Sequence, residues 1–341
     1  MLTIGYIGNG KSANRYHLPF VLTRKDKIKV KTIFDIHITH DIWNKIPDIY
    51  YTENLDELLN DSEIDLIVIC TRHDQQLHYK YAKTVLESGK HCLVEKPFME
   101  TSAQAKEIFA LAKEKGLIVQ AYQNRRFDSD FLTVQKVIES GKLGDLLEME
   151  MHFDYYRAEI PENVHTFNPA SSYLYGHGCH TIDQVISYFG KPDSIHYDVR
   201  QLLGDGRMND YFDLDLYYGV FKISVKSSYF RIKSRPSFIV YGKKGLFVKE
   251  TKDRMEEHLK LFYMPTQDGF GVDLPEHYGT LSYYDENNVY HEEKVVSEVG
   301  DYGRVYDDLY EAIINGADPT ITPEQTILQI EILETGVKGL K

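Results

Sequence analysis

A short apolar run that ends in a glycine-rich loop opens the chain. Residues 2–7 have the composition of a β-strand, and Gly8-Asn-Gly10-Lys-Ser-Ala13 follows them directly. This order fits the pattern G-x-G-x-x-[GA], in which a strand, a tight phosphate-binding turn and a helix follow one another. The same letters also fit G-x-x-x-x-G-K-[ST] if the loop begins at Gly5. The first pattern predicts a dinucleotide site, and the second predicts a nucleoside triphosphate site.

Three features of the neighbouring sequence favour the dinucleotide pattern. A triphosphate site needs an acidic residue after an adjacent strand to hold magnesium, whereas the apolar run "IDLIVICT" ends in Cys70 and Thr71 without a carboxylate. A dinucleotide site needs an acid after the second strand, and Asp35 stands there. A loop beginning at Gly5 would also leave only residues 1–4 for the first strand. We therefore predict a dinucleotide-binding loop.

The loop residues have separate expected roles. Gly8 makes the tight turn, Gly10 lets the backbone approach the pyrophosphate, and Ala13 permits close packing of helix against strand. The amides at the start of the following helix would bind the pyrophosphate. The expected cofactor contacts in this loop are Gly8, Asn9, Gly10, Lys11 and Ser12, with Lys11 as a surface side chain near phosphate.

Asp35 bears on the choice of cofactor. Its carboxylate would accept hydrogen bonds from the adenosine ribose and would repel a 2′-phosphate. No Arg or Lys follows it directly. The sequence therefore favours NAD over NADP as the cofactor, and NADP remains the alternative.

Short apolar runs alternate with amphipathic stretches over the first 122 residues. The pattern predicts strands over residues 2–7, 28–34, 64–71, 91–95 and 117–121. It predicts helices over residues 12–23, 55–59, 76–88 and 102–115, and Gly89 and Gly116 follow the last two as C-caps. Such alternation indicates an α/β Rossmann domain with a parallel sheet in residues 1–122.

The pattern changes in residues 123–341. One amphipathic helix is predicted over residues 131–140, and alternating apolar and polar residues then recur in "LLEMEMHFDYY" and "YFDLDLYYGVFKISVKSSYF". A hairpin is predicted around Gly242 to Gly245. Two helices close the chain, over residues 302–314 and 323–337, the second with Thr322 as a possible N-cap. We expect an α+β domain with a large, mostly antiparallel sheet, for which the resemblance described below implies substrate binding and oligomerisation.

The composition limits the class of partner. With 39 Lys and Arg against 52 Asp and Glu, the net charge is −13, which disfavours nucleic acid and anionic membranes. No apolar run reaches the roughly 18 residues of a membrane span, and Met1 leads into no signal-peptide pattern. We expect a cytoplasmic protein. Of its three cysteines, Cys70 and Cys92 lie in apolar runs and are expected to be buried thiols.

Several motifs in order make the chain similar to a known family. Glu95-Lys96-Pro97 in "LVEKPF" follows a predicted strand, "CTRHDQQLH" follows an earlier one, "NRRFD" enters the second domain, and G-x-H-x-x-D comes later. With the glycine loop, these motifs resemble the glucose-fructose oxidoreductase, inositol dehydrogenase and rhizopine-catabolism (Gfo/Idh/MocA) family over nearly the whole chain. Stretches such as "YQNRRFDSDFLT" look most like the branch that includes NADP-dependent scyllo-inositol dehydrogenases.

The resemblance implies roles around the nicotinamide. Lys96 would stabilise a developing alkoxide and help proton transfer, as a lysine beside a reacting carbon can, and Glu95 would orient the nicotinamide side. The peptide bond before Pro97 is cis in relatives, and we expect the same here. Further cofactor contacts are implied by position for Thr71, Arg72, His73, His78, Asn124 and Arg125, whereas Arg126 is either a contact or a structural ion-pair partner.

The second catalytic segment departs from the family pattern. The family usually has D-x-G-x-H-x-x-D, and Gly178, His180 and Asp183 match it, but Gly176 replaces the first Asp. The resemblance makes His180 the second catalytic residue, with a partner still to be identified. The alternatives for the partner of His180 are Tyr155, Tyr156, Tyr175 and His177. The expected substrate contacts are Tyr155, Tyr175, His177 and Asp183. For Asp183 a structural role is the alternative.

A metal site is not expected. His177, Cys179 and His180 are ligand types, but adjacent Cys and His point in different directions on a helix. No second spaced pair follows, and His165 is only a loose fourth candidate.

The motifs together predict an NAD(P)-dependent oxidoreductase for a sugar, polyol or related hydroxy compound. The hydride would pass between the carbinol carbon and the nicotinamide, while Lys96 and His180 would manage the hydroxyl proton. A homodimer or homotetramer is expected from the resemblance. Two alternatives are a cofactor-binding regulator without turnover, which the missing Asp at position 176 permits, and an NAD-dependent glycosidase of the same family.

Overall fold

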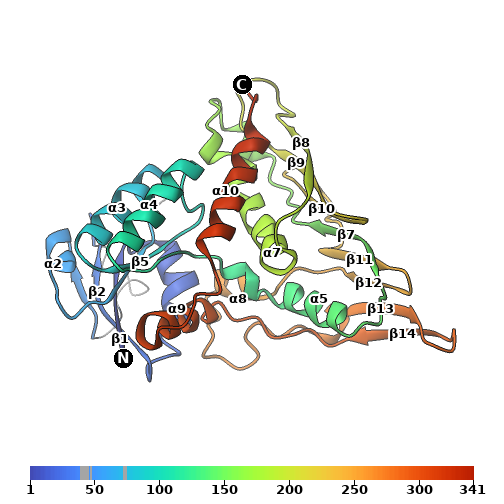
Figure 1. Ribbon diagram of the computed structural model, residues 1–341, viewed down its shortest axis with the longest axis horizontal. Helices are drawn as coiled ribbons and strands as arrows, with labels where there is room; N and C mark the ends of the chain where they lie inside the picture. The colour runs from blue at the N-terminus through green and yellow to red at the C-terminus, as the bar shows by residue number, and fades with distance from the viewer. Residues whose placement is uncertain (39–45, 47, 72–74) are drawn as a thin grey trace. The chain divides into compact units, whose positions relative to one another are not determined.

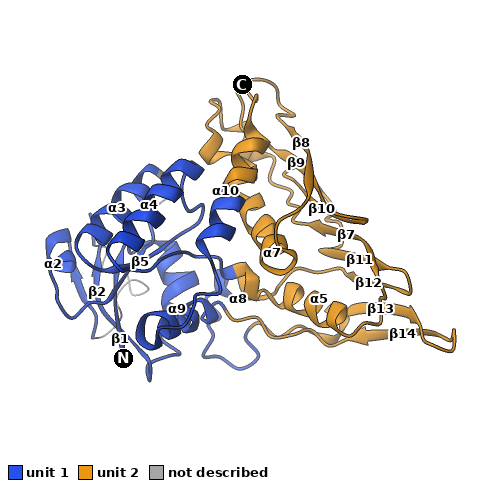
Figure 2. Cartoon of the chain, viewed as in Figure 1, with its two compact units in different colours: residues 1–124, 257–270, 302–330 blue, residues 125–256, 271–301, 331–341 orange. Residues whose placement is uncertain are grey.

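The computed structural model describes residues 1–38, 46, 48–71 and 75–341. The chain divides into two compact units, coloured separately in Figure 2. Unit 1 contains residues 1–124, 257–270 and 302–330, and unit 2 contains residues 125–256, 271–301 and 331–341. The domain boundary expected between residues 122 and 123 stays a prediction.

Unit 1 is built on a parallel six-stranded sheet in the order β3-β2-β1-β4-β5-β6. Its strands are β1 (Leu2–Ile7), β2 (Ile28–Phe34), β3 (Tyr50–Thr52), β4 (Leu66–Ile69), β5 (His91–Val94) and β6 (Val119–Ala121). The predicted Rossmann arrangement is confirmed, and five of its strands were expected. The short edge strand β3 was missed because three residues are too few to show an alternating pattern.

Helices cover this sheet (Figure 1). They are α2 (Leu55–Leu59), α3 (Gln75–Glu87), α4 (Ser102–Glu114) and α9 (Arg304–Asn315), preceded by the π-helix η1 (Ala13–His17) and the short α1 (Leu18–Val21). The helix expected over residues 12–23 is present as one helical run over residues 11–21, but residues 13–17 of this run are π-helical. Pro19 lies in the first turn of α1, and because proline lacks an N–H, it cannot continue the i→i−4 bonding of a regular helix.

A fully buried apolar cluster holds the sheet of unit 1 to its helices. Ile67 and Val94 of the central strands belong to it together with Leu86 of α3 and Ile108 of α4. Thr101 caps α4 by accepting a hydrogen bond from the backbone N–H of Gln104 at 3.2 Å, which satisfies one of the helix's unpaired amides. This packing fixes the strands whose ends carry the loops described below.

Unit 2 contains an eight-stranded sheet in the order β14-β13-β12-β11-β7-β10-β9-β8. The strands are β7 (Leu146–His152), β8 (Ser194–Arg200), β9 (Tyr211–Tyr218), β10 (Phe221–Ser228), β11 (Phe238–Gly242), β12 (Gly245–Lys249), β13 (Gly279–Tyr284) and β14 (Tyr290–Val295). Neighbours pair antiparallel except β7 and β10, which pair parallel. The expected mostly antiparallel sheet and the β11–β12 hairpin are both confirmed.

Helices α5 (Ser129–Glu139) and α7 (Cys179–Phe189) lie on one face of the second sheet (Figure 1). Phe131 of α5 stacks on Phe238 with ring centroids 6.1 Å apart, and Phe189 at the end of α7 packs against Phe221 at 5.3 Å. The remaining elements are η2 (Asn124–Phe127), α6 (Glu159–Glu162), η3 (Pro169–Ser171), η4 (Leu174–Gly178), α8 (Met255–Lys260), η5 (Pro275–His277) and α10 (Pro323–Val337). Within the described residues, every helix is too short or too polar to cross a lipid bilayer.

Candidate functional site

The loops that follow the strands of unit 1 gather at one edge of its sheet. Gly8 follows β1, Asp35 follows β2, Thr71 comes shortly after β4, and Glu95 follows β5. From β1 the chain runs through β2 to β3 at one edge of the sheet and then crosses back to β4 on the other side of β1, so the strand order reverses between β1 and β4. Ligands of open α/β sheets bind at such a point, outside the carboxyl ends of the strands.

The glycine loop has the backbone that the dinucleotide pattern requires. Gly8 has a φ of +106°, and a Cβ at this position would lie 2.5 Å from the carbonyl oxygen of Cys70. By contrast, apart from Gly10 itself and its two chain neighbours, no atom of the described residues lies within 4 Å of a Cβ built on Gly10, so the backbone there is open to a ligand. Gly5 lies inside β1. A phosphate loop beginning at Gly5 is therefore excluded.

Asp35 is tied to this loop. Its Oδ2 accepts a hydrogen bond from the backbone N–H of Asn9 at 2.7 Å. Asn14 supports the same turn by donating from Nδ2 to the carbonyl oxygens of Asn9 and Gly10, both at 3.0 Å. The acid predicted to meet the adenosine ribose thus lies directly beside the predicted pyrophosphate loop.

Glu95 belongs to a buried hydrogen-bond network in unit 1. Its Oε1 lies 3.0 Å from His17 Nε2 and also accepts from the Ser12 hydroxyl. The other nitrogen of His17 lies 2.6 Å from the hydroxyl of Tyr306, which in turn lies 3.1 Å from that of Tyr6. Burial alone would raise the pKa of Glu95, but the His17 hydrogen bond and charge, with Lys96 and Ser12, lower it below its usual value. Glu95 is therefore ionised.

His17 and Tyr306 were missed in the sequence. His17 lies within the expected first helix, and Tyr306 lies in α9, 289 residues away. Tyr122 stacks on the His17 ring with centroids 3.8 Å apart. A histidine four residues after Ala13 was the only local signal, and nothing in the sequence connected it to a distant tyrosine.

The segment after Glu95 is held from two sides. Lys96 donates its backbone N–H to Glu95 Oε2 at 2.9 Å, and the peptide bond between Lys96 and Pro97 is cis, as expected. His78 is fully buried, with Nδ1 2.9 Å from the carbonyl oxygen of Pro97. This position favours a role for His78 in supporting the Lys96 segment. Its cofactor contact stays a prediction, as does that of half-buried Thr71, while Arg72 and His73 lie outside the described residues.

In unit 2, His180 lies in the first turn of α7 directly after the π-helix η4. The residue is 5 % exposed. His177 of η4 packs its ring against Tyr155, with centroids 5.2 Å apart and the planes at 69°. Apart from the chain neighbours and the nearby backbone of its own helix, no atom of the described residues lies within 4 Å of a Cβ built on Gly176. The position of the usual family Asp therefore has room for a side chain.

Asp183 and Arg126 form a buried ion pair. Arg126 donates from Nε and Nη2 to the two carboxylate oxygens at 2.8 and 2.7 Å, and the Asp183 and Arg126 side chains are 2 % and 8 % exposed. Both oxygens of Asp183 are thus engaged within unit 2. This geometry favours the structural alternative for both residues over contact with substrate.

The remaining predicted positions differ in exposure. Tyr175 is 1 % exposed and Asn124 is 6 % exposed, so contact of Tyr175 with substrate and of Asn124 with cofactor stays a prediction. Tyr156 is exposed at 60 %. Arg125 binds Asp128 at 3.1 Å and also pairs with Glu256.

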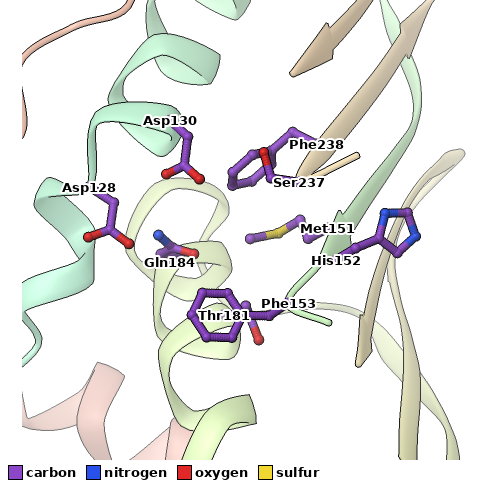
Figure 3. Close-up of a pocket in the computed structure, with 9 residues that line it drawn as sticks. All are labelled: Asp128, Asp130, Met151, His152, Phe153, Thr181, Gln184, Ser237 and Phe238. Carbon is purple, nitrogen blue, oxygen red and sulfur yellow. The ribbon is translucent and has the colours of Figure 1, made fainter. Parts of the chain in front are cut away.

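A small cavity lies under the sheet of unit 2 (Figure 3). Asp128 and Asp130 line it from the α5 side, and Met151 and Phe153 from β7 and its end. Its volume is about 10 Å³, which is about the space one water molecule needs. This cavity is therefore too small to hold a sugar.

The chain matches two family models that together span most of its length. Residues 2–123 match the NAD-binding Rossmann fold of the Gfo/Idh/MocA oxidoreductase family, and residues 135–339 match its C-terminal alpha/beta domain. These two ranges correspond to the predicted order of domains.

Similar proteins come from several bacteria. The uncharacterized oxidoreductase YhhX of Escherichia coli is 48 % identical, covering 98 % of this chain and 96 % of the relative. The scyllo-inositol 2-dehydrogenase (NADP(+)) IolW of Bacillus subtilis is 30 % identical, covering 100 % and 94 %. The crystal structure of an oxidoreductase from Bacillus cereus superposes with a TM-score of 0.92 at 44 % identity, covering 98 % of this chain and 95 % of that one. The chain thus belongs to the Gfo/Idh/MocA oxidoreductase family.

Proposed function

We propose that this oxidoreductase transfers a hydride between a nicotinamide cofactor and a carbinol carbon of a sugar, polyol or related hydroxy compound. The observation that carries the proposal is the edge of the unit 1 sheet. There the Gly8–Gly10 loop and Asp35 follow β1 and β2, and Glu95 and Lys96 follow β5. The similarity to IolW, a scyllo-inositol dehydrogenase, supports a polyol-like substrate.

The residues of unit 1 fit a dinucleotide. The open backbone at Gly10 and the amides at the start of η1 would hold the pyrophosphate, and Asp35 would hold the adenosine ribose. The nicotinamide, when bound, supplies a hydride acceptor or donor. The Asp35 carboxylate would repel a 2′-phosphate, so we propose NAD as the preferred cofactor.

Two side chains would manage the substrate hydroxyl. The Lys96 ammonium would donate a hydrogen bond to the hydroxyl oxygen and stabilise negative charge that develops there. His180 would accept the hydroxyl proton during oxidation and return it during reduction. Glu95, kept ionised by His17, would orient the nicotinamide side of the site.

The setting of the enzyme is part of the same proposal. We propose a cytoplasmic homodimer or homotetramer with a small-molecule substrate and no nucleic acid or membrane partner. The net charge of −13 supports the exclusion of polyanionic partners.

A second candidate function is a cofactor-binding regulator without turnover. Gly176 favours it, because the usual proton-accepting Asp is replaced by a residue without a side chain. The two functions share cofactor binding and differ in catalysis.

A titration followed by a substrate panel separates these functions. NADH and NADPH are titrated by nicotinamide fluorescence, and polyols and sugars are then assayed with both oxidised cofactors. We expect Lys96→Met to lower kcat by about 100-fold, a typical share for a proton-transfer group, with NADH affinity retained. Lys113→Met, at an exposed lysine of α4, is the matched control and should leave both kcat and NADH affinity unchanged. A protein that binds neither cofactor contradicts the proposal, and one that binds but oxidises nothing in the panel favours the regulator.

A further inference from the structure

Lys252 of unit 2 belongs to no motif of the sequence, yet it lies half-buried against two aromatic rings. Its Nζ is 4.3 Å from the ring centroid of Phe153 and 4.3 Å from that of Tyr155. It donates one hydrogen bond, to the carbonyl oxygen of Asp154 at 2.6 Å. The end of β7 and the chain after β12 therefore meet at this ammonium.

Two arginines extend the arrangement. The guanidinium carbon of Arg125 lies 4.9 Å from the Phe153 centroid, and that of Arg157 lies 4.7 Å from the Tyr155 centroid. Three cations thus surround two rings, each within the range of a cation–π contact. We call these five residues, Arg125, Phe153, Lys252, Tyr155 and Arg157, the cation–aromatic cluster.

The three cations of the cation–aromatic cluster differ in their pairing with carboxylates. Arg125 is paired with Asp128 and Glu256. Within the described parts of the chain, neither Lys252 nor Arg157 has a carboxylate oxygen within 4.0 Å. The nearby carboxylate of Asp154 is taken by Arg235, at 2.9 and 3.0 Å.

The electrostatics of Lys252 reflect this difference. Burial and the neighbouring charge of Arg125 lower its pKa to about 8, against the opposing effects of Asp154, Glu256 and Asp130. An ammonium removed from water without an anionic partner is unfavourable. A ligand that brings a negative charge would offset this cost.

The cation–aromatic cluster is continuous with the catalytic segment of the same unit. The His177 ring lies 5.2 Å from that of Tyr155 and 6.2 Å from that of Phe153, centroid to centroid. His177 is in η4, and His180 follows it by three residues at the start of α7. A group bound at Lys252 would therefore be close to the segment that carries the proposed proton acceptor.

We propose that the cation–aromatic cluster binds an anionic group of the substrate, so that the enzyme acts on an acidic derivative of a sugar or polyol, with Lys252 as its specificity residue. This inference rests on the proposed function and narrows its substrate class. The Lys252 ammonium and the Arg157 guanidinium supply the donors for a carboxylate or a phosphate. Phe153 and Tyr155 hold these cations in place through the cation–π contacts.

Calorimetry with three related ligands tests the inference. D-glucose, D-glucuronate and D-glucose 6-phosphate are titrated into the full-length protein at one ionic strength, without cofactor and with saturating NADH. We expect at least one acidic ligand to bind about tenfold more tightly than D-glucose, the equivalent of about 1.4 kcal/mol. Comparison of the two acids distinguishes a carboxylate from a phosphate.

Three variants assign the effect to Lys252. Lys252→Met should remove the preference for the acidic ligand, whereas Lys252→Arg, which keeps the positive charge, should retain most of it. Lys243→Met removes an exposed lysine of the β11–β12 turn that pairs with Asp145, and it should leave the preference unchanged. Circular dichroism and thermal melting confirm that each variant is folded.

The outcomes separate this inference from the function on which it rests. Equal affinity for all three ligands, or a preference that persists in Lys252→Met, would overturn the anionic subsite. If Lys252→Met does not fold, the other two variants still test the anionic subsite. Loss of the preference for acidic ligands in folded Lys252→Arg, or in Lys243→Met, would count against a subsite at Lys252. Failure of nicotinamide binding, measured separately by fluorescence, would instead overturn the proposed oxidoreductase site.

Discussion

Glu95 shows how a single residue of the family motif depends on partners far away in the chain. Its side chain is 8 % exposed, and His17 and Ser12 bind it. A buried carboxylate is unstable unless it is hydrogen-bonded and its charge is balanced. The motif therefore needs His17 and, through His17, Tyr306 of α9.

Replacing Glu95 with Gln should destabilise unit 1. We expect the free energy of unfolding at pH 7 to fall by about 2 kcal/mol, because the charge-assisted bond to His17 is lost. The pKa of Glu95 is lowered in the folded chain. Its contribution is therefore complete above the unfolded carboxyl pKa of about 4.3 and is lost as the pH falls below that value. Urea unfolding of both proteins between pH 3 and pH 7 measures the difference.

Glu107→Gln is the control for this prediction. Glu107 is exposed on α4, where it pairs with Lys83, and exposed pairs contribute little to stability. A wild-type advantage over Glu95→Gln that does not shrink on acidification would contradict the assignment of an ionised Glu95.

Gly176 can be given the side chain that the family usually has there. A Cβ at Gly176 meets no described atom within 4 Å, so we expect Gly176→Asp to cost less than about 1 kcal/mol of stability. The new carboxylate, one turn before His180, should move the lower limb of the pH–rate profile upward by about one unit. The measurements are urea unfolding and kcat/KM against pH.

Gly178→Asp is the matched control two residues later. A Cβ at Gly178 would lie 2.7 Å from Leu174 Cδ1 and 3.5 Å from Phe212 Cζ. This variant should lose stability through overpacking, by about 2 kcal/mol. Equal losses for the two variants would show that Gly176 is not in open space.

Among the elements, the loop between β1 and η1 contains two glycines with different expected roles: Gly8 makes the turn, and Gly10 leaves room for the pyrophosphate. Gly8→Ala places a methyl group against the carbonyl of Cys70 in a backbone with positive φ. It should cost about 2 kcal/mol of stability and weaken cofactor binding. Gly10→Ala should leave stability within about 1 kcal/mol, yet weaken NADH binding by at least about tenfold by occupying the approach to the pyrophosphate.

Thermal unfolding and NADH fluorescence titration of both variants test this distinction. If Gly10→Ala binds NADH as tightly as the wild type, the pyrophosphate does not approach this glycine. If Gly8→Ala is as stable as the wild type, the loop adjusts its backbone at little cost.

The elements differ in how well their sequence predicts them. The bounds of β1, β2, α2 and α10 are those expected. In these elements the local signals agree with one another: apolar periodicity marks the elements, Asn54 caps α2, and Thr322 and Pro323 mark the start of α10. The π-helices η1 and η4 were not expected. Both carry proposed site residues or their neighbours, and π-helices are common at functional sites.

At the scale of the whole molecule, the chain contributes to unit 1 in three separate stretches. Ile330 belongs to the unit 1 core, and Tyr302 packs on Phe20 with centroids 5.2 Å apart. Residues 302–330 therefore complete a core that residues 1–124 begin.

A fragment of residues 1–124 should not fold as the intact protein does. Without Phe270 and Tyr302 it exposes the apolar surface around Phe20, and without α9 it leaves His17 without Tyr306, so that buried groups are unsatisfied. We expect a poorly cooperative thermal transition and weak amide dispersion in NMR spectra. A fragment that unfolds as sharply as the full chain would show that the later stretches contribute little to unit 1.

Local periodicity and short spacings were enough to predict the Rossmann sheet, the mostly antiparallel second sheet, the family and the residues of its motifs. The partners of those residues could be found only in the three-dimensional structure. His17 and Tyr306 meet across 289 positions, Arg126 and Asp183 across 57, and Lys252 lies over rings almost a hundred residues earlier. Such pairs form because folding buries polar groups that must find partners, and the choice of partner depends on packing in three dimensions.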